Sequence, residues 1–132
     1  MSIDEAKVRE MIAASIAEIQ KYDATLFQDL VGSRVIIRDN MSGVYVGELL
    51  STSRAGAVVG GGARQLHYWA QGGSVAQIAE AGIGGADSRV TAPLSSDKGY
   101  RFQAPNIVSI YEMTDIAWER VHAFPAWTGG LD

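Results

Sequence analysis

The sequence predicts an α+β fold, with a mostly antiparallel, barrel-like β-sheet body, an N-terminal amphipathic helix and two short helices. Residues 1–29 carry aliphatic side chains at helical spacing, whereas residues 30–132 alternate short β-branched runs with turns rich in Gly and Ser. The length of 132 residues fits one domain, and the absence of Cys means that its core depends on apolar burial without disulfides.

The first unit, residues 1–29, is expected to be a helix followed by a connector. Ser2 and Glu5 have the spacing of a capping box, which indicates a helix over residues 3–22. Aliphatic side chains recur along one face at Val8, Met11, Ile12, Ile16 and Ile19. This apolar stripe is narrow and leaves two roles open: the helix caps the core of the body, or it packs against a copy of itself and supports oligomerisation.

The second unit, residues 30–132, is expected to be the β-rich, ligand-binding body. β-branched and aromatic residues predict strands over residues 34–38, 44–50, 57–59, 64–69, 89–94, 100–103 and 106–113. We interpret residues 60–62 as a hairpin loop, residues 95–99 as a hairpin turn and residues 124–132 as a tail.

Two short helices are expected between and after these strands. Ser74 and Gln77 form a second capping box, and Gly82 is typical of a helix end. Thr114 and Asp115 are suited to cap a last helix near residues 116–122.

The charge distribution argues against two classes of partner. The chain has 11 basic and 15 acidic residues, a net charge of −4 and no basic run, so we expect no binding to duplex nucleic acid. No apolar run approaches the ~20 residues that span a bilayer, and the N-terminus lacks the layout of a signal peptide. We therefore expect a soluble, cytosolic protein without a membrane partner.

Residues suited to catalysis or metal binding are sparse. His67 and His122 are the only histidines, and neither lies in a cluster with metal-ligand spacing. We expect His67 to be a hydrogen-bonded structural residue in a strand. The glycines at 60–62 lack the pattern of a phosphate-binding loop. The sequence thus predicts no catalytic residue, no metal, no cofactor and no enzymatic activity.

Residues 63–74 combine groups that suit a small nucleotide. Arg64 is suited to a phosphate, the rings of Tyr68 and Trp69 are suited to stack on a base, and a backbone N–H at Ser74 suits an anion. The structural alternative places Leu66 and Tyr68 in the core and makes Trp69 the contact between helix and sheet.

Residues 34–82 resemble the Thoeris anti-defence family of phage and prophage proteins. The matching stretches are residues 35–38, 42–49, 63–70 and 74–82, in the same order and at the same spacing. The most specific part is Arg64 followed by Tyr68-Trp69 and the Ser-capped helix, and residues 106–112 are similar to the family's last strand. Residues 1–29 and 123–132 have no secure match.

The resemblance implies an anti-defence sponge. Family members are small β-rich homo-oligomers that hold cyclic ADP-ribose signals at subunit interfaces without cleaving them, and some hold cyclic oligonucleotides at separate sites. It implies a nucleotide-binding phage protein in the cytoplasm of the infected bacterial host, assembled as a hexamer or another dimer-based oligomer. The alternative is an oligomeric phage structural or interaction protein with no small-molecule ligand.

The resemblance also implies ligand-binding positions. Arg38 matches the family's strand-end arginine and Arg64 the arginine before Tyr-Trp, whereas Asn106 matches only loosely. Arg120 lies where a neighbouring subunit can contribute a basic residue. An extra hairpin near residues 95–102 interrupts the region of the base-stacking residue, so that role stays open. The expected set is Arg38, Arg64, Tyr68, Trp69, Ser74, Arg89, Phe102, Asn106 and Arg120, with Tyr100 as a further candidate for stacking.

Overall fold

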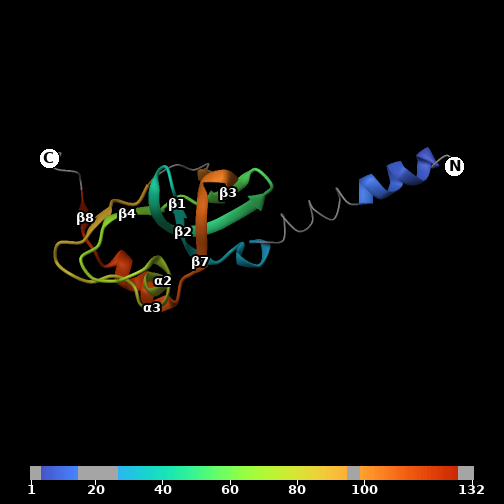
Figure 1. Ribbon diagram of the computed structural model, residues 1–132. Coiled ribbons are helices and arrows are strands. Elements are labelled where there is room, and N and C mark those ends of the chain that lie inside the picture. The colour runs from blue at the N-terminus through green and yellow to red at the C-terminus, as the bar shows by residue number, and fades with distance from the viewer. Residues whose placement is uncertain (1–3, 15–26, 95–98, 128–132) are drawn as a thin grey trace.

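The body of the protein is a half-barrel of mostly antiparallel strands with two helices packed against one face (Figure 1). The computed structural model describes residues 4–14, 27–94 and 99–127. With a third helical segment near the N-terminus, this arrangement confirms the predicted α+β class.

The strands are β1 (Arg34–Asp39), β2 (Gly43–Ser53), β3 (Gly56–Val59), β4 (Arg64–Tyr68), β5 (Arg89–Thr91), β6 (Tyr100–Gln103), β7 (Ile107–Glu112) and β8 (Ala126–Trp127). The helices of the body are α2 (Val75–Ala81) and α3 (Asp115–His122), and two single 3₁₀ turns are η1 (Gln28–Leu30) and η2 (Ala104–Asn106).

Strand β2 organises the sheet because other strands pair along both of its edges. Strand β1 runs antiparallel along one edge, from the pair Arg34–Glu48 to the pair Asp39–Gly43, and β7 pairs with the far side of β1. Strands β4 and β3 follow one another along the opposite edge of β2. Strand β6 pairs with β3, and β5 and β8 extend the sheet beyond β4.

A bend in β2 lets the sheet curl. The neighbour of β2 changes from β4 at Val46 to β3 at Leu49, and the strand register shifts just beyond this point, between Leu49 and Ser51. A Cβ atom on Gly47 would contact the Cγ1 atom of Val59 and lie 3.1 Å from the Cβ atom of Ala63. The absence of a side chain at position 47 therefore allows the two halves of the curled sheet to approach each other closely.

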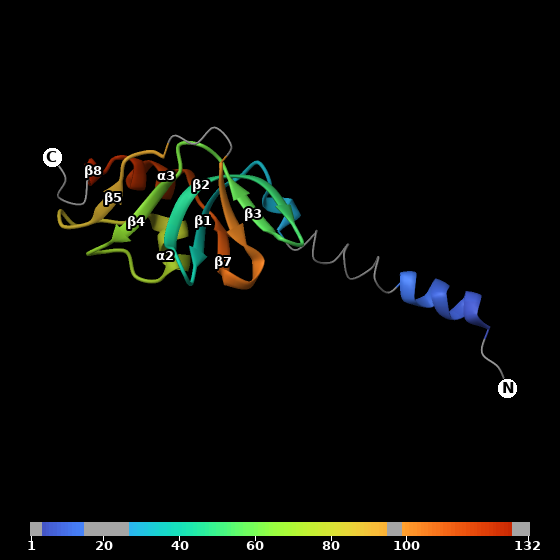
Figure 2. The ribbon, with the colours of Figure 1, turned by 90° about the horizontal axis from the view of Figure 1, so that it is seen from above.

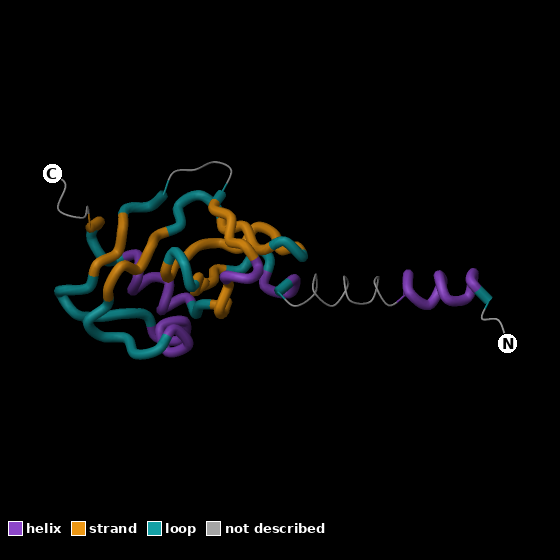
Figure 3. The backbone as a smooth tube through the Cα atoms, turned by 45° about the horizontal axis from the view of Figure 1, so that its top comes forward, coloured by secondary structure: helices purple, strands orange, loops and turns teal. Residues whose placement is uncertain are grey.

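The core has two parts, one on each face of the sheet. The part between the sheet and the two helices includes Ile36, Leu66 and Ile78, all buried. The part inside the curl includes Ile37 and Leu49. Figure 3 shows α2 and α3 together on the same side of the strands.

The capping predictions for both short helices are confirmed. The hydroxyl of Ser74 accepts from the N–H of Gln77, whose side chain accepts from the N–H of Ser74, and the helix ends at Gly82 with φ of +80°. The Thr114 hydroxyl oxygen accepts from the N–H of Ala117 at the start of α3.

Three predictions about connections are wrong. Strands β5 and β6 do not form a hairpin, because β6 pairs with β3, whereas β5 pairs with β4 and β8. The hairpin turn expected between them falls largely on residues 95–98, which lie outside the described residues. Residues 60–62 join two strands that continue along one edge of β2, and the Gly60 N–H donates to the carbonyl of Glu48 at 2.9 Å. The expected tail contains β8, which pairs in parallel with β5.

The N-terminal segment is helical over residues 5–14 (Figures 1 and 2). Asp4 is its N-cap, because its carboxylate accepts from the N–H of Ala6 at 3.0 Å. Val8 and Ile12 of the apolar stripe are exposed. The rest of the helix expected over 3–22 lies outside the described residues, as does Ser2 of the expected capping box. Within the described residues, no helix is both long and apolar enough to cross a membrane.

Candidate functional site

A cleft of about 780 Å³ lies at the tip of the β1–β2 hairpin. Its walls are the hairpin turn at residues 38–44, the end of β4 with Trp69, the start of α2 at residues 73–75, and Val108 of β7. We call it the hairpin cleft. It brings together Arg38, Trp69 and Ser74 of the sequence-predicted set.

The hairpin turn places Arg38 at the cleft. Strand β1 alternates its side chains so that Arg38 lies on the same sheet face as Ile36, which faces the helices. The next residue, Asp39, is buried, and its Oδ1 atom accepts from the N–H groups of Met41 and Ser42 at 2.8 and 2.9 Å. The carboxylate therefore fixes the turn, while the exposed Arg38 guanidinium remains at the cleft.

Gln65 supplies a fixed amide to the wall of the cleft. Its side-chain Nε2 donates to the carbonyl of Ser42 at 2.9 Å, and its backbone N–H donates to the Thr91 hydroxyl oxygen at 2.9 Å. The Tyr45 hydroxyl donates to the same Ser42 carbonyl at 3.2 Å. Two strands therefore hold the tip of the hairpin in place.

Two rings on β4 and the following loop border the cleft. Trp69 is half-buried against the core, and its Nε1 donates to the carbonyl of Gly73 at 3.0 Å. His67 is exposed, and its ring stacks on Trp127 with centroids 4.3 Å apart. His67 lies in β4, as predicted, but its ring makes this stack and no hydrogen bond with the described residues.

Ser74 lines the cleft, but its expected hydrogen-bond donor is already used. The backbone N–H of Ser74 donates to Oε1 of Gln77 at 2.8 Å. The expectation that this N–H binds an anion therefore does not fit the geometry.

Arg64 differs most from the position expected of a ligand-binding residue. It is only 3% exposed and lies in the core beside the C-terminal end of α3. Its Nε donates to the carbonyl of Thr91 at 2.7 Å. Its Nη1 donates to the carbonyls of Val121 and His122 at 3.4 and 3.3 Å, and its Nη2 donates to the carbonyl of Phe124 at 2.9 Å. Burial lowers the pKa of the guanidinium. Arg64 is held by the fold and does not line the hairpin cleft.

Phe102 is also unavailable to a ligand. It is 7% exposed and packs edge-on against Tyr45, with ring centroids 5.1 Å apart, inside the curl of the sheet. The expectation that it stacks on a base therefore does not fit its burial.

The other predicted residues do not line the hairpin cleft. Tyr68 is 50% exposed on β4, and the guanidinium of Arg89 lies 5.4 Å from the ring centroid of Trp127. Asn106 is half-buried, and its carbonyl accepts from the N–H of Asn40 in the hairpin turn at 2.9 Å. Tyr100 is half-buried against the core inside the curl.

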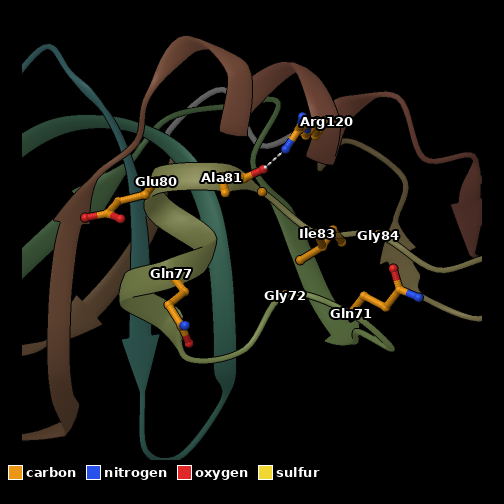
Figure 4. A pocket seen from close by; sticks show the side chains of 9 residues that line it. Gln71, Gly72, Gln77, Glu80, Ala81, Ile83, Gly84 and Arg120 are labelled. Carbon is orange, nitrogen blue, oxygen red and sulfur yellow. Dashed lines mark hydrogen bonds between the residues drawn. The ribbon is translucent and has the colours of Figure 1, made fainter.

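Arg120 belongs to a second cleft, of about 550 Å³, between α2 and residues 71–72 and 82–84 (Figure 4). Its Nη1 donates to the carbonyl of Ala81 at 2.8 Å, at the last turn of α2. A cation at a helix C-terminus donates to carbonyls that lack a partner within the helix and interacts favourably with the negative end of the helix dipole. This contact gives Arg120 a structural role.

Sequence reasoning missed Asp39, Asn40, Gln65 and His67, which line the hairpin cleft together with Arg38. The alternation of β4 contains the relevant information, because Gln65 and His67 alternate with the buried Leu66 and must lie on the other face of that strand. The pairing of β2 with β4, which places Gln65 beside Tyr45 near the hairpin turn, is a tertiary fact.

Comparisons with known proteins identify a family but no function. Within the described ranges, no group of three or more His, Cys, Asp and Glu residues could hold a metal ion. No curated protein and no solved structure matches the sequence. The model of a domain of unknown function, DUF6948, matches residues 32–121, and the chain therefore belongs to the DUF6948 family.

Proposed function

We propose that the protein is a phage-type anti-defence sponge, which binds cyclic nucleotide immune signals in the hairpin cleft and sequesters them without cleavage. The single observation that carries the proposal is that one cleft joins a cation, an aromatic ring and several amide and hydroxyl groups. The sequence resemblance to the Thoeris anti-defence family supplies the ligand class, namely cyclic ADP-ribose isomers or cyclic oligonucleotides.

The size and the polar groups of the cleft suit such a ligand. A volume of about 780 Å³ lies within the range of small-molecule sites. The exposed guanidinium of Arg38 is suited to a pyrophosphate, since its planar fork binds phosphate oxygens in pairs. Trp69 and His67 supply ring surfaces for a base, and the amide of Gln65 supplies hydrogen bonds to its edge.

The side chains that could act as acid or base in the cleft are held by other contacts. The Oδ1 atom of Asp39 accepts two N–H groups of the hairpin turn, and His67 stacks on Trp127. These contacts favour a binding site over a catalytic one. The proposed setting is the cytoplasm of the infected host, where a homo-oligomer would present several copies of the cleft.

The test is an incubation with a panel of cyclic ADP-ribose, its ribose–ribose-linked isomers and cyclic oligonucleotides. The protein is then separated from free nucleotide and denatured by heat, and the released fraction is analysed by mass spectrometry. A sponge returns the intact nucleotide in amounts proportional to protein. Altered nucleotide that increases with time would instead indicate an enzyme, and no bound nucleotide would favour a structural or interaction protein.

A further inference from the structure

The amide of Gln65 has one orientation in the hairpin cleft. Its Nε2 donates to the Ser42 carbonyl at 2.9 Å, and a carbonyl can only accept, so the nitrogen must lie on that side of the amide. The backbone of Gln65 is held in turn by its N–H bond to the Thr91 hydroxyl. The side-chain oxygen, Oε1, accepts no hydrogen bond from the described residues.

The Ser42 carbonyl is itself held in position. It also accepts a hydrogen bond from the Tyr45 hydroxyl at 3.2 Å. The backbone N–H of Ser42 donates to the buried carboxylate of Asp39 at 2.9 Å. An amide rotated by 180° would place Oε1 against the Ser42 carbonyl, so that two acceptors would face each other. The hairpin therefore fixes which end of the Gln65 amide acts as an acceptor.

We infer that Gln65 determines which base the hairpin cleft accepts, because its fixed Oε1 atom pairs with an exocyclic amino group. This inference rests on the proposed function. Adenine carries an amino donor at C6, whereas hypoxanthine carries an oxo acceptor at the same atom. An acceptor placed opposite Oε1 leaves both oxygens without a partner, which costs more than the lost hydrogen bond alone. The cleft therefore selects adenine over hypoxanthine.

The experiment compares cyclic ADP-ribose with cyclic inosine diphosphate ribose, which differ at C6, by calorimetry on the full chain. The wild-type protein should bind the adenine form about 3- to 10-fold more tightly, which is the ratio that one hydrogen bond supplies. In Gln65→Met the ratio should fall to about 1, because the thioether cannot replace the acceptor. Gln65→Glu should lower the ratio as well, because a carboxylate cannot donate to the Ser42 carbonyl and its acceptor is then no longer held in place.

Gln71→Met is the matched control. Gln71 is an exposed glutamine that lines the second cleft and not the hairpin cleft, so this variant should keep the wild-type ratio. Equal binding of the two nucleotides by the wild-type protein would overturn the role of Gln65 and leave the proposed function in place. Binding of neither nucleotide by the wild-type protein would overturn the Gln65 role as well, and failure of the whole panel would overturn the proposed function. If Gln65→Met kept the wild-type preference for the adenine nucleotide, a group other than Gln65 would distinguish the two bases.

Discussion

The Nη2 atom of Arg64 donates a hydrogen bond of 2.9 Å to the carbonyl oxygen of Phe124, which lies 60 residues further along the chain. The same guanidinium binds carbonyls of Val121 and His122 at the end of α3 and of Thr91 on β5. Its charge thus lies at the negative end of the α3 dipole. Arg64 therefore joins β4, β5, α3 and the segment that leads into β8.

Replacement of Arg64 by Ala should destabilise the fold. Loss of the guanidinium leaves buried carbonyls without donors, and hydrogen bonds to charged groups contribute about 1.5–3 kcal/mol each. We expect the free energy of unfolding, measured by urea denaturation, to fall by at least about that amount. Arg38→Ala is the control, because Arg38 is exposed and its loss should change stability by less than about 0.5 kcal/mol. Equal stability of the two variants would contradict the structural role of Arg64.

Replacement of Arg38 by Ala should instead weaken nucleotide binding. A charge-assisted bond to a phosphate is expected to contribute about 1.5–3 kcal/mol, so affinity should fall tenfold or more. Calorimetry with a nucleotide from the panel measures the change. Arg89→Ala is a matched control, because Arg89 lies over Trp127 outside the hairpin cleft. If both variants bind like the wild-type protein, the phosphate is not held by Arg38.

The elements of the body could be predicted because each carries its own local cause. Both short helices have capping side chains, and β1 is a β-branched run that ends at a turn fixed by Asp39. The pairing of strands could not be predicted in the same way. Nothing local to residues 100–103 specifies that β6 pairs with β3, because that choice depends on the curl of the whole sheet.

The candidate site shows the same division. Arg38 and Trp69 could be chosen from residue type and strand position, and they do line one cleft. Arg64 was expected at the ligand because of the resemblance to the Thoeris anti-defence family, yet it is buried and donates to carbonyls at the end of α3. Those carbonyls belong to residues distant in the sequence, so neither residue type nor the resemblance could predict this burial.

Acid should weaken the fold through His122. Burial lowers the pKa of this imidazole, the positive charges of Arg64 and Arg34 lower it further, and a hydrogen bond with the Trp118 carbonyl opposes them. Because the unfolded chain takes up the proton at its ordinary pKa of about 6.5 and the folded chain only at a lower pH, the unfolded state binds more protons in between. The free energy of unfolding should therefore decrease as the pH falls below about 6.5, until the lowered pKa is passed.

Urea denaturation at several pH values between 7.5 and 5 measures this dependence. Carboxylates contribute to the slope as well, so the decisive quantity is the difference between the wild-type protein and His122→Gln, which cannot titrate there. His67→Gln is the control, since His67 is an exposed residue. Identical pH profiles of the wild-type protein and His122→Gln would contradict the role of His122.

Replacement of Ile12 by Lys should weaken self-association without unfolding the body. Ile12 is 55% exposed on the N-terminal helical segment, and the apolar stripe there favours contact with a second copy. Light scattering at micromolar concentration should show an oligomer for the wild-type protein and a smaller species for the variant, with the same melting temperature. Ile116→Lys, a change at an exposed residue of α3, is the control. A wild-type monomer, or an unchanged mass in Ile12→Lys, would contradict the prediction.

Replacement of Gly47 by Ala should destabilise the curled sheet. The new methyl group would contact the Cγ1 atom of Val59 across the bend of β2, and overpacking of this kind typically costs about 1–3 kcal/mol. Val59→Ala removes the opposing methyl groups, so the double variant separates this contact from a general effect of Ala in the strand. We expect Gly47→Ala to cost less free energy of unfolding in the Val59→Ala background than in the wild-type protein, giving a coupling of at least about 0.5 kcal/mol. Additive losses would mean that the bend tolerates a side chain and that the close approach at Gly47 does not limit the packing of the half-barrel.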